Sequence, residues 1–165
     1  MVRNLVSKTN EKIKRRNPKM KTLKLILIFC LLFLFTLSFA QTKGSFKVIV
    51  HKSNSNSSLN KVEISKLFLK KTTRWKGSKQ KVEPVDLVDT SPVRENFSTE
   101  IHNKKVGAIK AYWQKLIFSG RRVPPPEKKT DIDVLKYVHE NTGAIGYVSN
   151  SANLKNYDVK ILKVE

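Results

Sequence analysis

Residues 81–97 read KVEPVDLVDTSPVRENF, and this stretch decides the fold because a strand pattern runs directly into a helix start. The segment 81–88 is rich in valine and leucine and predicts a strand, with Pro84 placing it at a sheet edge or a strand start. Ser91 and Pro92 then have the pattern of an N-cap followed by the first helical residue. A strand that leads into a helix in this way is the repeating unit of α/β proteins.

The sequence on either side predicts further strands and helices in alternation. The helix that starts at Ser91 has one apolar stripe, formed by Val93, Phe97 and Ile101. Further strands are expected at 45–50, 143–149 and 157–164, and further helices at about 60–70, 106–118 and 130–140. The order is roughly β-α-β-α-α-α-β-β, which predicts an α/β fold with a mixed, mostly parallel sheet flanked by helices.

Two of these helices have capping patterns at their starts. Asn60 and Glu63 stand three residues apart, as do Thr130 and Asp133, and each pair fits an N-cap with its partner. The apolar residues expected to face inward are Ile64, Leu67 and Phe68 in the first of these helices, and Ile132, Leu135 and Val138 in the second.

The N-terminal segment predicts export rather than a folded domain. Residues 25–40 (LILIFCLLFLFTLSFA) carry no charge and follow a basic stretch, which is the pattern of a secretory signal peptide ending at Ala40. We therefore expect a signal segment over 1–40, with 1–19 as a possible over-extended start, and one domain over 41–165. The alternative is an uncleaved signal that anchors the chain in the membrane. Cleavage would remove Cys30, which is the only cysteine.

Composition and charge exclude several classes of protein. The chain has 165 residues, with 33 Lys+Arg against 13 Asp+Glu. This length fits one domain and excludes a multidomain enzyme, and a single cysteine excludes a disulfide scaffold. The positive charge would suit nucleic acid, but an exported chain without an aromatic-interleaved basic motif is not expected to bind it. The histidines and acids show no metal-ligand spacing, and no catalytic motif is present, so neither a metal, a cofactor nor an enzyme activity is expected.

Several separated motifs together resemble a known family. They are ISKLFLKKTTRW (64–75), VEPVDL (82–87), DTSPVRENF (89–97), AYWQKLIFSGRRVPP (111–125) and GAIGYVS (143–149). In this order they are similar to the phosphate-binding proteins of phosphate ABC transporters, and most of all to short members of that superfamily. The resemblance implies a single lobe of the type II periplasmic-binding-protein fold, over about residues 46–149.

The start of the helix at Ser91 is the candidate anion site. Free amides at a helix start, the positive end of the helix dipole and the hydroxyls of Thr90 and Ser91 all favour an oxyanion, and Arg94 could add a charge-assisted bond. Asp89 would compete for the same amides. Pro92 also differs from the Ser-Gly-Thr helix start of the large relatives, because it removes one amide donor.

These observations predict an exported solute-binding protein for phosphate or a similar oxyanion, used in uptake or sensing. We expect it to be periplasmic or secreted. Its partners would be the anion and a membrane permease, a porin or a sensor, or a second copy that completes the half site of a single lobe. The alternative is a single-lobe envelope protein that has lost solute binding and acts as a protein-interaction module. The absent second lobe, Pro92 and the lack of the arginine that precedes the helix start in the large relatives favour it.

Overall fold

The computed structural model describes residues 45–165, so the predicted signal segment over 1–40 lies outside the described residues. The described chain is an α/β fold, and it covers nearly all of the domain that we expected over 41–165. Its helices are α3 (Lys61–Phe68), α4 (Pro92–His102), α5 (Val106–Phe118) and α6 (Asp131–Glu140). Its strands are β1 (Phe46–His51), β2 (Ser58–Leu59), β3 (Glu83–Pro84), β4 (Asp86–Leu87), β5 (Glu127–Lys128), β6 (Ala144–Ser149), β7 (Val159–Ile161) and β8 (Lys163–Val164).

The sheet is mixed, as predicted. The main sheet has four strands in the order β3-β6-β1-β7. Strand β1 is antiparallel to both β6 and β7, whereas β3 is parallel to β6. Two short parallel pairs, β2 with β8 and β4 with β5, lie beside it. Three of the five strand pairings in the described chain are parallel, but within the main sheet two of the three are antiparallel, including the longest ladder, between β1 and β6.

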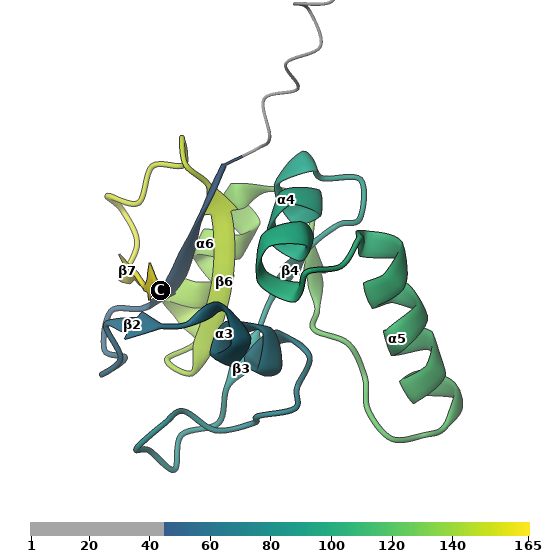
Figure 1. Ribbon diagram of the computed structural model, residues 1–165. Coiled ribbons are helices and arrows are strands. Elements are labelled where there is room, and N and C mark those ends of the chain that lie inside the picture. The colour runs from purple at the N-terminus through teal and green to yellow at the C-terminus, as the bar shows by residue number, and fades with distance from the viewer. Residues whose placement is uncertain (1–44) are drawn as a thin grey trace, which may run out of the picture. The chain divides into compact units, whose positions relative to one another are not determined.

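Helices α3 and α4 lie on one face of the main sheet and α6 lies on the other (Figure 1). Gly146 of β6 faces α6, since a Cβ atom there would lie 2.7 Å from Val134. The next residue, Tyr147, faces the other way and stacks on Phe97 of α4 at 3.8 Å between ring centroids. Phe68 of α3 completes this aromatic group. Alternate residues of one buried strand therefore pack against α6 on one face and against α3 and α4 on the other.

Both predicted caps are confirmed. Asn60 and Glu63 bond each other's backbone amide reciprocally, and the Thr130 side chain accepts from the Asp133 amide. The prediction that Ile132 faces inward is wrong, because its side chain is 55% exposed. Val134 occupies the buried face in its place.

The predicted strand over 81–88 is divided into two. Strand β3 pairs with β6, and β4 pairs with β5, so the chain changes partner at Val85. Pro84 has no amide hydrogen to donate, which suits the end of a ladder. The short strands β2 and β5 were not predicted.

Helix α5 packs chiefly against α4, at the side of the fold (Figure 1). Ile109 and Trp113 of α5 form a small apolar cluster with Leu69, apart from the main core. Trp113 is 5% exposed, and the hydroxyl of the neighbouring Tyr112 donates to the Leu69 carbonyl. At its far end, Phe118 is 89% exposed.

Candidate functional site

The start of α4 lies at the end of a tight turn that leads out of β4. The Ser91 amide donates to the Val88 carbonyl at 3.0 Å, which closes this turn. Ser91 is the N-cap, but its side chain makes no capping bond, and Pro92 fills the first helical position. The first amides of a helix have no partner within it. The Ser91 hydroxyl, which does not cap the helix, therefore lies beside the first backbone amides of α4, which have no hydrogen-bond partner within the helix.

Thr90 and Asp89 occupy the turn itself. Thr90 is exposed, as a residue that meets a solute must be. The predicted competition from Asp89 is partly relieved, because its carboxylate lies 2.5 Å from Lys110 Nζ in α5. Lys110 lowers the pKa of Asp89, and the Thr90 backbone also donates to this carboxylate. The negative charge at the turn is therefore paired by a cation from the neighbouring helix.

Arg94 is buried beneath the helix start rather than presented to solvent. Its side chain is 4% exposed, and its Nη2 lies 3.1 Å from Asp86 Oδ2. Its Nη1 lies 2.7 Å from Glu127 Oε1 and also donates to the Leu87 carbonyl. These partners come from β4 and β5, so Arg94 ties α4 to both strands. Its contacts favour a positioning role over the direct ligand role that we expected.

Asp86 and Tyr147 extend this arrangement into the core, and with Arg94 and Glu127 they form what we call the Arg94 cluster. The Tyr147 hydroxyl donates to Asp86 Oδ1, and the Leu87 amide donates to the same oxygen at 3.0 Å. Removing a carboxylate from water is unfavourable unless charged and polar partners replace the lost hydration. Asp86 has such partners on both oxygens.

The pKa shifts follow from burial of these groups. Desolvation raises the pKa of Asp86, while the charge of Arg94 opposes that change. Burial and the nearby Asp86 carboxylate raise the pKa of the Tyr147 hydroxyl well above its usual value, so it remains a hydrogen-bond donor. Burial, with a smaller contribution from Arg94, lowers the pKa of His102 to about 4. The carboxylate of Asp86 neutralises Arg94 here, so little of its charge is left for a solute.

Sequence reasoning found the helix start but not the Arg94 cluster. Asp86 and Arg94 stand eight residues apart across a turn, and Glu127 and Tyr147 come from later segments. The one sequence signal available was the presence of an acid, Asp86, and an arginine, Arg94, on either side of the turn between β4 and α4.

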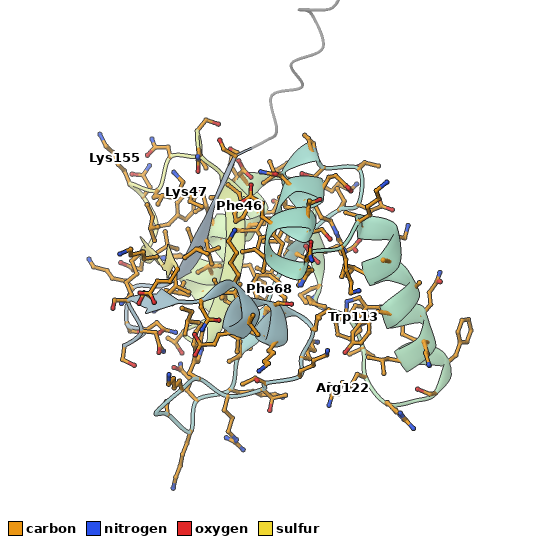
Figure 2. All side chains as sticks on the ribbon, viewed as in Figure 1. Phe46, Lys47, Phe68, Trp113, Arg122 and Lys155 are labelled. Atoms are coloured by element: carbon orange, nitrogen blue, oxygen red, sulfur yellow. The ribbon has the colours of Figure 1, made fainter. Side chains whose placement is uncertain are left out.

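The long polar loop that follows β1 lies away from the α4 start. The polar loop over 51–58 follows the end of β1, whereas the ring of Phe97 in α4 contacts Phe46 at the beginning of that strand. Figure 2 labels Phe46 there, and Phe68 on α3. The loop therefore lies at the opposite end of β1 from the α4 start.

Two other kinds of feature are not found in the part of the chain that the structure describes. Within residues 45–165, no group of three or more His, Cys, Asp or Glu side chains is placed to hold a metal ion. No helix over the same residues is long and apolar enough to cross a membrane.

Among the comparisons with known proteins, the one with solved structures supports the fold. The sequence matches no protein-family model and no curated protein. One similar structure, assigned as a phosphate ABC transporter substrate-binding protein from Clostridium perfringens and holding bound phosphate, is 25% identical with a TM-score of 0.56. An ABC-type phosphate transport receptor from Vibrio cholerae is 19% identical with a TM-score of 0.57. A chain from Planctomyces limnophilus, assigned as a phosphate binding protein, is 16% identical with a TM-score of 0.54.

These similarities confirm the predicted resemblance and the predicted fold class. Each covers 73% of this chain, but the chain spans only 44%, 46% and 41% of the three structures in turn. The similarity therefore applies to less than half of each of those proteins.

Proposed function

We propose that this protein is a solute-binding protein that holds phosphate or a similar oxyanion at the start of α4. The proposal rests on the Ser91 hydroxyl, which lies at the start of α4 and makes no capping hydrogen bond there, in a fold similar to that of phosphate-binding proteins. Thr90 and Ser91 contact the anion with their hydroxyls, and the first amides of α4 complete the donor set. Arg94 acts from below, where it fixes α4 against β4 and β5.

The proposal includes a cellular setting. The protein acts after export, in the periplasm or outside the cell, and performs no catalysis. It delivers the anion to a membrane permease, a porin or a sensor, or a second copy completes the site. The chain spans less than half of the similar phosphate-binding structures, so we expect residues 45–165 by themselves to bind the anion weakly.

The test is isothermal titration of the purified protein, expressed as the full chain, with phosphate and then sulfate at low salt. We expect saturable heat that Ser91→Ala reduces. Ser78→Ala is the matched control, because Ser78 is an exposed serine in the turn before β3. Absence of heat, together with an unchanged melting temperature at millimolar anion, would contradict the proposal.

A second candidate function is the interaction module without solute binding. The observation that favours it is the end of α5, where Phe118 is 89% exposed and Ile117 is 49% exposed. These two adjacent side chains leave apolar surface exposed at the helix end, and contiguous exposed apolar surface is typical of a contact site. This function predicts no anion heat. It also predicts that a photo-cross-linker at position 118 captures one defined envelope protein, whereas a cross-linker at position 104 does not.

A further inference from the structure

A pocket of about 340 Å³ lies away from the α4 start. Its lining comes from three connecting segments, around residues 70–73, 81–84 and 122–126, and from Tyr137 of α6. None of Thr90, Ser91 and Arg94 lines it, so it is distinct from the site proposed above. We call it the Lys70 pocket.

Lys70 is fixed at the edge of this pocket by backbone carbonyls. Its Nζ donates to the Val123 carbonyl at 3.0 Å and to the Pro124 carbonyl at 3.1 Å. An ammonium group has three donors, so one remains. Lys70 also has a left-handed backbone with a φ of 52°, which a non-glycine residue seldom adopts. The fold therefore holds this cation in a defined place.

Two further cations line the pocket, and they have no carboxylate partner. Among the ion pairs formed by residues 45–165, none includes Lys70, Lys81 or Arg122. Figure 2 labels Arg122 on the segment that follows α5. Burial, followed by the nearby charge of Lys81, lowers the pKa of Lys70, as expected for a partly desolvated cation beside a like charge. Glu83 is the one acid in the lining.

The rest of the lining adds hydroxyls and apolar surface. Thr72 and Thr73 supply the hydroxyls, and Val82, Pro84 and the ring of Tyr137 supply apolar walls. An inorganic anion would use the cations but not these walls. A ligand with an oxyanion group and a small apolar or ring-shaped body would use both.

We propose that the Lys70 pocket binds an organic oxyanion, of the class of a phosphate monoester, between Lys70, Lys81 and Arg122. This site goes beyond the proposed function, because it takes a different ligand at different residues. The phosphoryl group can belong to a free small molecule or to a polymer, and the recognition chemistry is the same.

The experiment titrates the purified protein, expressed as the full chain, with phenyl phosphate, inorganic phosphate and a soluble polyphosphate at low salt. We expect phenyl phosphate to bind about tenfold more tightly than inorganic phosphate at this pocket, because its ring contacts the apolar walls. The variant Lys81→Ala/Arg122→Ala should weaken phenyl phosphate binding at least about tenfold, because it removes two of the three cations.

The matched control is Lys79→Ala/Arg121→Ala. This variant also removes one lysine charge and one arginine charge. Lys79 and Arg121 are exposed, lie in the same segments as Lys81 and Arg122, and do not line the pocket. The control should change binding by less than about twofold, since exposed charges outside the pocket act only through a screened field. All four replaced side chains are exposed, so we expect both variants to fold.

A third variant separates this proposal from the proposed function. Ser91→Ala should leave unchanged the component of phenyl phosphate binding that Lys81→Ala/Arg122→Ala removes, whether or not it alters binding of inorganic phosphate. Tighter binding of polyphosphate than of phenyl phosphate, lost in the pocket variant, would identify a polymer as the source of the phosphoryl group. The reverse order would identify a free small molecule. Equal losses in the pocket and control variants, or no saturable binding of phenyl phosphate, would overturn the proposal.

Discussion

Among individual side chains, His102 has the clearest consequence for pH. Its Nδ1 lies 2.9 Å from the Ser65 hydroxyl, and its ring packs against Phe97 with centroids 5.4 Å apart. Burial, followed by the charge of Arg94, lowers the pKa of His102 from 6.5 to about 4. The folded protein therefore keeps this imidazole neutral at pH values where the unfolded chain protonates it.

We predict that stability falls as the pH decreases from about 6.5 to about 4. His102 contributes its full stabilisation above pH 6.5, because both states are then neutral at this group, and loses it as the unfolded state binds the proton. Between pH 7 and pH 4.5 the loss should be roughly 2 to 3 kcal/mol. Urea unfolding at both pH values measures it.

The variant His102→Gln should show a smaller loss over the same range. His51→Gln is the control, and it should keep the loss of the original protein because His102 is still present. If His102→Gln and the original protein lost stability equally, the assignment to His102 would be wrong.

Within single elements, strand β6 packs closely against helix α6. A Cβ atom on Gly146 would lie 2.7 Å from Val134 Cγ1 in α6 and 2.9 Å from Val85 Cγ1. Both neighbours are themselves fully buried. No side chain larger than hydrogen therefore fits here without displacing the helix or the connection between β3 and β4.

We predict that Gly146→Ala lowers the free energy of unfolding by about 1 to 3 kcal/mol, because it overpacks this contact. Gly107→Ala is the matched control. Gly107 lies in α5 with nothing within 4 Å of its Cβ position, and alanine there should be neutral or stabilising by up to about 1 kcal/mol. Urea unfolding of both variants measures the difference. A Gly146→Ala protein as stable as the original would contradict the packing described for β6.

The helices could be predicted from sequence more completely than the strands. Capping pairs and apolar stripes are local signals, so α3, α4, α5 and α6 appear close to their expected places. Strands β2 and β5 have two residues each, and such strands depend on a distant partner rather than on their own sequence. Ile132 was misplaced because the buried face of α6 is centred on Val134, Leu135 and Val138, and residue 132 lies on nearly the opposite side of the helix from Val134.

Prediction of the candidate site from the sequence was likewise limited to features with a local pattern. The α4 start could be predicted because Ser91 and Pro92 form a local pattern. The Arg94 cluster could not, because Asp86, Glu127 and Tyr147 meet only after the sheet has formed. Burial of Arg94 is therefore a tertiary effect, and it changes the role that sequence alone suggested.

Across the described chain, positive charge exceeds negative charge. Residues 45–165 hold 23 of the 33 Lys+Arg and 12 of the 13 Asp+Glu, a formal net charge of +11. Few of these cations are paired, because the described ion pairs include only Lys76, Arg94, Lys110 and His139. The folded chain therefore repels itself.

We predict that sodium chloride stabilises the protein by screening this repulsion. Raising the concentration from about 0.02 M to about 0.3 M shortens the screening length severalfold, and the melting temperature should rise by a few degrees. Thermal unfolding followed by circular dichroism measures the change. A fall in melting temperature would mean that the ion pairs outweigh the repulsion.

Helix α5 has a consequence for how the fold opens. It shares with Leu69 a small apolar cluster that is separate from the main core, and the pair between Lys110 and Asp89 adds only a partly exposed bond. A unit held by so few buried contacts can detach while the sheet stays intact. Backbone amides of α5 should therefore exchange with deuterium through a local opening, well before those of β6, which exchange only when the whole fold is lost.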